Sequence, residues 1–200
     1  MDRTDYLDRL LAKYSGTFDI YKPYVVHGRE YPAYGYFFSC VEKYVLVREA
    51  NLWSSKSYEH VMFLSEEKCT LETLEEVKQL WEGYMEPELV CHGTKEPEEN
   101  HMYSYLSVIV IAEHKLEREI AKQIRKLNFE KGYRFNMRGY SQGHIAVVSM
   151  EDEKVYANFV GRKLKTVLKE TFHDVRNGRI GFEELLKKTE SQAFTQTVIE

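Results

Sequence analysis

Six polar residues in the second half of the chain have the chemistry of an anion-binding site. They are Lys131, Arg134, Arg138, Asn158, Arg162 and Lys163. Guanidinium and ammonium groups bind phosphate oxygens, and the free N–H groups at a helix start add to that attraction. We therefore predict an anionic ligand, either a phosphate-bearing small molecule or a nucleic acid. The competing interpretation is a solvated surface on which each cation pairs with a nearby glutamate.

The pattern around Arg134 predicts how part of this site would be positioned. Apolar and polar residues alternate from Tyr133 to Arg138, which is typical of a half-buried strand with Arg134, Asn136 and Arg138 on its polar face. Arg162 and Lys163 lie near the start of a helical stripe. We expect these cations to converge on one surface.

A metal-dependent nuclease is the alternative function. The order of helix, strands, helix and strand between Tyr6 and Ala112 resembles the core of restriction-endonuclease-like enzymes. That resemblance implies an acidic residue and a Glu-x-Lys pair that hold Mg²⁺ and a water. Glu66 and Lys68 form such a pair in this sequence, and Asp19 is the other candidate carboxylate.

Two further groups of residues have metal-ligand chemistry without a metal-site pattern. The segment around Gly178 resembles the second half of an EF-hand loop, but Val175 occupies a ligand position without a side-chain oxygen. Cys91, His92 and His101 fit no zinc spacing. The chain also has no P-loop, dinucleotide-binding glycine motif, nucleophile elbow or HExxH motif. We predict no metal and no cofactor.

The elements that would position these residues indicate an α+β fold. Residues 101–112 form the longest nearly uncharged run, and its apolar part from Leu106 to Ala112 predicts a strand covered on both faces. Amphipathic stripes predict helices on either side of it in the sequence. Shorter strands are predicted elsewhere, including 33–41 and 44–49. We expect a mixed, mostly antiparallel sheet with 103–112 in its centre and helices packed on it.

The length of 200 residues fits a single domain, 1–200. Within it, lobes 1–85 and 101–185 each combine helices with strands, and 86–100 resembles an acidic linker between two similar αβ halves. The first hundred residues carry a net charge of −8 and the second hundred +4, within a total of −4. A basic half favours an anionic partner, although a solvated surface gives the same asymmetry.

The sequence also predicts a cellular setting. The N-terminus has no apolar segment of a secretory signal, and no apolar run reaches the roughly 20 residues of a membrane span. The 3 cysteines, Cys40, Cys69 and Cys91, are scattered and odd in number, which favours a reducing compartment over a disulfide framework. We expect a cytoplasmic protein that does not bind membranes, and a homodimer is compatible with this composition.

Four segments resemble the pattern of an uncharacterised bacterial domain family. They are His101–Tyr105, Lys131–Phe135, Arg138–Tyr140 and Asn158–Lys163. The resemblance covers most of the chain and implies a bacterial, cytoplasmic protein, but no activity. Together with the residues above, it leads us to expect a binding or accessory module for an anionic ligand, and not an enzyme.

Overall fold

The computed structural model describes residues 2–43 and 53–197, so the predicted strand 44–49 lies outside the described residues. The strands are β1 Asp19–Tyr21, β2 Tyr24–Val26, β3 Arg29–Tyr31, β4 Ala33–Lys43, β5 Trp53–Glu66, β6 His101–Ala112, β7 Glu130–Gly132, β8 Tyr140–Ser149 and β9 Lys154–Ala157. The α-helices are α1 Arg3–Tyr14, α2 Leu71–Leu80, α3 Arg118–Lys126, α4 Lys165–Arg176 and α5 Phe182–Thr197. A π-helix, η1 Trp81–Val90, follows α2, and a 3₁₀-helix, η2 Val160–Leu164, precedes α4.

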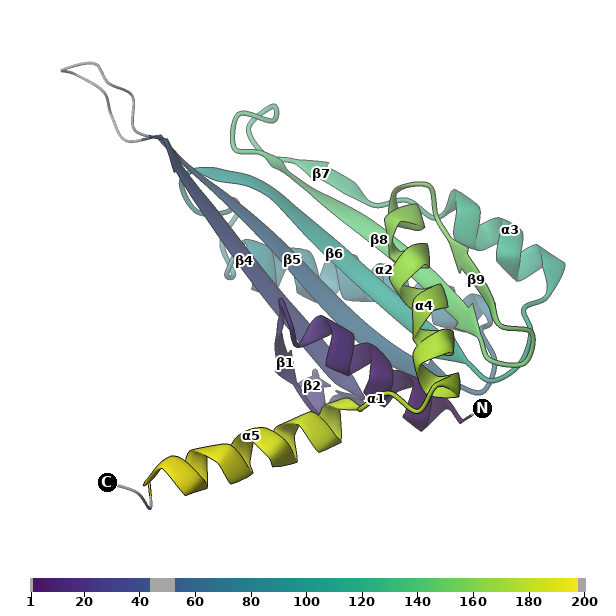
Figure 1. The fold of residues 1–200 in the computed structure, drawn as a ribbon. Coiled ribbons are helices and arrows are strands. Elements are labelled where there is room, and N and C mark those ends of the chain that lie inside the picture. Colours follow the sequence, from purple (N-terminus) through teal and green to yellow (C-terminus); the bar gives the residue numbers. More distant parts are fainter. Residues whose placement is uncertain (1, 44–52, 198–200) are drawn as a thin grey trace.

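In the described part of the chain, one mixed sheet has the strand order β1-β4-β5-β6-β8-β7, and β9 also pairs with β8. Strand β6 runs parallel to both of its neighbours, β5 and β8, whereas the other pairs are antiparallel. The predicted central strand and the mostly antiparallel α+β fold are thus confirmed. Lobes 1–85 and 101–185 contribute strands to this same sheet (Figure 1).

Helices cover both faces of the sheet. On one face, α1 and α4 pack Leu10 and Leu168 against Phe63 and Ile109. On the other face, α2, η1 and α3 join a second core, whose buried residues include Trp81. Figure 1 shows that α1 and α4 reach over only one half of their face, and that the part nearest the starts of β6 and β8 extends beyond them. Successive side chains of β6 point to opposite faces of the sheet, and in the covered half helices bury both faces. This explains why the second half of β6 is apolar at nearly every position.

The predicted strand over residues 133–138 is wrong. Strand β7 ends at Gly132, and Arg134, Phe135 and Asn136 adopt left-handed backbone angles, with φ of 47°, 55° and 64°. The N–H of Arg138 bonds to the carbonyl of Tyr133 at 3.1 Å, which closes a tight turn between β7 and β8. The alternating residues therefore do not share faces: one of them, Tyr133, is buried, whereas Phe135 is fully exposed.

Residues 86–100, predicted as a linker, begin inside a helix. The π-helix η1 continues through Pro87 to Val90, and the N–H of Cys91 bonds to the carbonyl of Glu86 at 3.0 Å. The side chain of Glu86 is buried, where it accepts hydrogen bonds from Cys91 and Tyr133, each 3.0 Å long. This segment is therefore attached to the sheet at its first residue.

Candidate ligand-binding site

The basic residues of the β7–β8 turn are paired with carboxylates. Lys131 Nζ lies 2.9 Å from Glu86 Oε2, and Arg134 Nε lies 2.7 Å from Glu96 Oε2. The guanidinium of Arg138 lies 3.6 Å from a carboxylate oxygen of Glu96 and 3.6 Å from one of Glu99. The structure thus brings Arg134 and Arg138 together, but around a shared glutamate.

Asn158 has a structural role. Its side chain is 1% exposed, and its Oδ1 accepts from the N–H groups of Ile145 at 3.3 Å and Gly161 at 2.9 Å. Its Nδ2 donates to the carbonyls of Leu127 at 3.1 Å and Gly143 at 3.0 Å. These bonds use both ends of the amide, so Asn158 joins backbone segments and does not face the other predicted residues.

Arg162 and Lys163 lie on η2, away from the β7–β8 turn. The guanidinium of Arg162 is exposed and lies 4.6 Å from the ring centre of Phe159. The ammonium of Lys163 lies 3.6 Å from the ring centre of Tyr105, on the face of the sheet that α1 and α4 cover in part. Partial burial lowers the pKa of Lys163, and the nearby charge of Glu59 opposes that effect. Lys163 is thus an exposed cation whose ammonium rests on an aromatic ring.

Tyr105 belongs to a row of tyrosines on the uncovered half of this face. The ring centres of Tyr103 and Tyr105 are 4.5 Å apart, and those of Tyr103 and Tyr140 are 6.3 Å apart, with interplanar angles of 29° and 32°. Tyr103 pairs with Tyr140 across β6 and β8. We call Tyr103, Tyr105 and Tyr140 the tyrosine row. Sequence reasoning missed Tyr103 and Tyr105, although their spacing of two in a strand does place them on one face.

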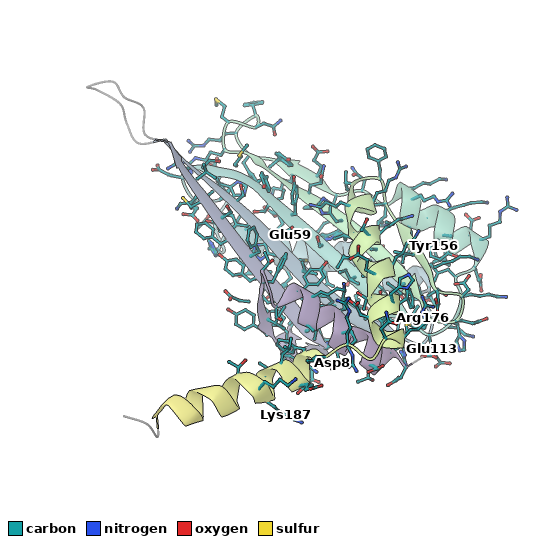
Figure 2. The ribbon with its side chains drawn as sticks, viewed as in Figure 1. Asp8, Glu59, Glu113, Tyr156, Arg176 and Lys187 are labelled. Carbon is teal, nitrogen blue, oxygen red and sulfur yellow. The ribbon has the colours of Figure 1, made fainter. Side chains whose placement is uncertain are left out.

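Buried polar residues continue the same face toward α1. Ser107 Oγ donates to Glu59 Oε1 at 3.1 Å and lies 3.4 Å from Nδ1 of His144. The other ring nitrogen of His144 lies 3.2 Å from Oε1 of Gln142. Burial, and then the charge of Lys163, lowers the pKa of His144 to about 3, so its imidazole is neutral at pH 7. Figure 2 shows Glu59 on this face of the sheet.

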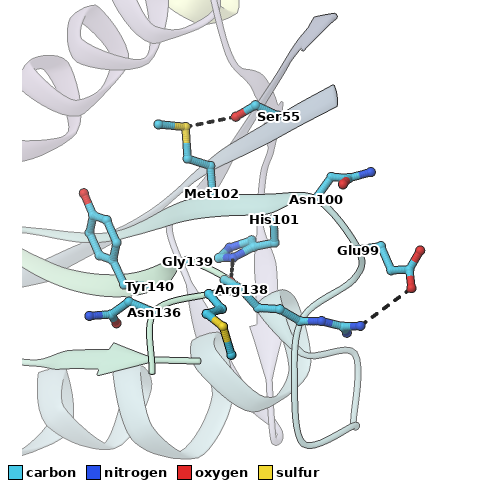
Figure 3. Close-up of a pocket in the computed structure, with 10 residues that line it drawn as sticks. Ser55, Glu99, Asn100, His101, Met102, Asn136, Arg138, Gly139 and Tyr140 are labelled. Atoms are coloured by element: carbon cyan, nitrogen blue, oxygen red, sulfur yellow. Dashed lines mark hydrogen bonds and ion pairs between the residues drawn. The ribbon is translucent and has the colours of Figure 1, made fainter. Parts of the chain in front are cut away.

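Hollows lie at both ends of the tyrosine row. A cavity of about 260 Å³ beside Lys163 is also lined by Tyr14, Phe18 and Glu59. A second hollow of about 500 Å³ lies where β6 and β8 begin, and Tyr140, Met102 and Arg138 line it (Figure 3). Because Tyr140 lines the second hollow and Lys163 touches Tyr105, the row connects the two predicted groups of cations.

The family comparison covers most of the chain. Residues 2–170 match the family model described as "Domain of unknown function (DUF8052)". The chain belongs to the DUF8052 family. The predicted resemblance to an uncharacterised domain family is thereby confirmed, and the match includes all six predicted site residues of this DUF8052 domain. Comparisons with curated proteins and with solved structures each gave no significant match.

The residues considered for metal binding in this DUF8052 domain are dispersed. In the sheet register, Asp19 lies opposite Tyr36 of β4, and Tyr36 lies opposite His60 of β5. His60 is six residues from Glu66 along β5, so Asp19 and Glu66 are separated by about 20 Å in the strand direction. Glu66 itself pairs with Arg29 at 3.2 Å. Among the described residues, no three His, Cys, Asp or Glu side chains are grouped so that they could hold a metal ion. None of the described helices has the length and apolar character needed to cross a membrane.

Proposed function

We propose that this DUF8052 domain is a non-enzymatic binding module for an anionic, phosphate-bearing ligand, with Lys163 as the cation at its site. The ligand is a small molecule or a nucleic acid, and it lies on the uncovered half of the sheet face. Arg162 lies next to Lys163 on η2, and its exposed guanidinium extends the positive charge toward solvent.

The observation that supports this proposal most is the placement of Lys163. Among the described residues, no carboxylate lies within ion-pairing distance of its ammonium, which instead rests 3.6 Å above Tyr105. A cation–π contact is worth roughly 0.5–2 kcal/mol, whereas hydrogen bonds to charged groups contribute roughly 1.5–3 kcal/mol. A phosphate can therefore draw the ammonium from the ring, and that movement exposes the face of Tyr105 to the rest of the ligand.

The second predicted group, Lys131, Arg134 and Arg138, stays part of the proposal as an accessory surface. Its arginines pair with the half-buried Glu96 and the exposed Glu99, and surface ion pairs contribute only about 0–1 kcal/mol, whereas Lys131 pairs with the buried Glu86. A phosphate can compete for these arginines, but with a lower gain than at a cation that has no carboxylate partner. We therefore expect Lys163 to dominate.

Calorimetric titration with adenosine monophosphate tests the proposal, with adenosine as the uncharged comparison. We expect Lys163→Met, which keeps the apolar stem, to weaken binding of the nucleotide at least tenfold. Lys122→Met on α3, where the ammonium pairs with Glu119, is the matched control and should bind like the wild type. Circular dichroism melting of each variant checks that the fold is retained.

The double variant Arg134→Ala/Arg138→Ala separates the two groups of cations. We expect it to keep most of the affinity of the wild type. If it abolishes binding while Lys163→Met does not, the proposed site is wrong and the ligand lies at the turn. If wild-type protein binds the nucleotide no better than adenosine, the anionic-ligand proposal itself is wrong.

The nuclease alternative requires Mg²⁺-dependent cleavage that is lost in Glu66→Ala. Since Asp19 and Glu66 do not converge, we expect oligonucleotides to stay intact when they are incubated with the protein and Mg²⁺. Cleavage that Glu66→Ala abolishes would replace the binding proposal.

We further propose a bacterial, cytoplasmic setting and a homodimer. All three cysteines are free thiols, as a reducing compartment predicts. Phe135 and Met137 are 101% and 79% exposed on the β7–β8 turn, and such apolar side chains favour a protein contact. Light scattering after gel filtration should show a dimer, and Phe135→Ser should shift it toward monomer.

A further inference from the structure

The tyrosine row and its two charged ends indicate a more specific ligand. We infer that the site binds single-stranded nucleic acid, with bases stacked along Tyr103, Tyr105 and Tyr140 and phosphates near Lys163 at one end and Arg138 at the other. This inference rests on the proposed function, because it takes Lys163 as an anion-binding residue.

The rings of Tyr103 and Tyr105 stack on each other with centres 4.5 Å apart, so bases would extend this stack at its free faces and on Tyr140. Tyr103 and Tyr105 are separated by two positions of β6, which corresponds to about 7 Å along the strand, and Tyr140 lies beside Tyr103 on β8. The rings are inclined to one another by about 30°. Near-parallel aromatic rings on a sheet are a general platform for unpaired bases, because every base has a π-face.

The two ends of the row favour a ligand with more than one phosphate. Lys163 contacts Tyr105 directly, and Tyr140 and Arg138 line the same hollow at the other end. A mononucleotide can satisfy one end only, whereas an oligonucleotide supplies phosphates to both and bases between them. Linking the two contacts in one molecule raises affinity through effective concentration.

A duplex fits this surface less well than a single strand. In a duplex the bases stack on one another inside the helix, so their faces are not available to side chains on an open sheet. The polar residues next to the row also suit exposed base edges: Gln142 is half-buried, and Glu59 and Lys163 line the adjacent cavity. Amide and carboxylate oxygens accept hydrogen bonds from base N–H groups, including the N3–H of thymine and uracil.

The charge balance predicts how strongly binding depends on salt. The chain has a net charge of −4, so long-range attraction for a polyanion is absent. Contacts from Lys163 and Arg138 would neutralise about two phosphates, and each contributes a slope of about −0.7 for single strands. The logarithm of the association constant should therefore fall with the logarithm of salt concentration with a slope of about −1.4.

Fluorescence anisotropy with labelled twelve-nucleotide oligothymidylate and oligouridylate tests the inference. We expect the dissociation constant of each oligonucleotide to be at least tenfold lower than that of thymidine monophosphate, measured by competition. It should also be lower than that of a duplex of the same length. Tyr103→Leu and Tyr140→Leu should each weaken oligonucleotide binding roughly 5- to 150-fold, the range for loss of one stacked base. Tyr156→Leu, on the opposite face of the sheet, is the matched control and should bind normally.

The outcomes separate this inference from the proposed function. If a mononucleotide binds in a Lys163-dependent manner and added length or Tyr103 makes no difference, the single-strand inference is wrong and the anionic-ligand proposal stands. If the duplex binds as tightly as the single strand, the inference is also wrong. If Lys163→Met changes neither mononucleotide nor oligonucleotide binding, the proposed function fails and the inference fails with it.

Discussion

Buried histidines, among them His60 and His144, show how single residues set the pH range of this fold. His60 is 3% exposed, and its Nδ1 lies 2.7 Å from the hydroxyl of Tyr34. Its Nε2 has no hydrogen-bond partner among the described residues. Burial, and then the charges of His92 and His101, lowers the pKa of His60 to about 3. Protonation would therefore place an uncompensated positive charge in the core.

Acid should destabilise the protein through these histidines. A histidine in the unfolded chain has a pKa of about 6.5, whereas His60 and His144 have pKa values of about 3 in the fold. Between these values the unfolded state binds protons that the native state does not. The free energy of unfolding should thus fall with decreasing pH, by up to about 1.4 kcal/mol per pH unit for each histidine.

Urea unfolding between pH 7 and pH 4 measures this dependence. We expect His144→Asn to make the slope shallower by up to about 1.4 kcal/mol per pH unit, since the proton uptake of this histidine on unfolding is removed. His173→Asn, at an exposed position of α4, is the control that changes the same residue type without burial. An unchanged slope in His144→Asn would contradict a neutral, buried His144.

At the scale of elements, the sequence predicts those segments whose pattern of apolar residues is compatible with only one secondary structure. Strand β6 is predictable because an apolar run on both alternating faces requires cover from both sides, and the structure places β6 between two parallel neighbours. Helix α1 is predictable because its buried residues Tyr6, Leu7, Leu10, Leu11 and Tyr14 recur at helical spacing.

Other segments are not predictable because tertiary contacts override the local pattern. Alternation from Tyr133 to Arg138 is typical of a strand, but the left-handed turn separates Tyr133, which bonds to Glu86 at 3.0 Å, from the exposed Phe135. Pro87 ordinarily ends a helix, yet η1 continues past it. The convergence of the tyrosine row with Lys163 depends on strand order, which local spacing does not specify.

The packing of η1 against β8 gives a prediction at this scale. Trp81 is fully buried, and its Nε1 donates to the carbonyl of Leu106 at 2.9 Å. A Cβ on Gly143 would lie 2.8 Å from both Phe129 Cβ and Trp81 Cε2. We expect Gly143→Ala to lower the free energy of unfolding by about 1–3 kcal/mol through overpacking, measured by urea denaturation.

Gly83→Ala provides the matched control for that variant. Gly83 lies on η1, two residues after Trp81, but a Cβ on Gly83 would meet no atom within 4 Å. It should leave the stability unchanged or slightly raised, because alanine favours a helix over glycine. Equal effects of the two substitutions on the free energy of unfolding would contradict the idea that Gly143 is needed for the close contact with Trp81 and Phe129.

At the scale of the whole molecule, different parts of one sheet face contribute to stability and to the proposed binding. The half of the sheet under α1 and α4 carries the apolar core, and the half beyond them carries the tyrosine row. The basic second half of the sequence supplies Lys163 and Arg138, whereas the acidic first half supplies Glu86, Glu96 and Glu99, which pair with the turn. Part of the charge difference between the two halves of the sequence is therefore balanced by ion pairs within the protein.

The parallel junction of β5 with β6 joins the two halves of the chain from Lys56 to Glu66. Neither half can satisfy the backbone groups of that junction alone, so each would expose an open, apolar strand border that favours aggregation. Residues 1–100 and 101–200 produced separately should precipitate, whereas co-expressed fragments should remain in solution and co-purify. The protein is thus suited to a split-reporter format, in which recovery of the folded sheet signals that two fused partners have met.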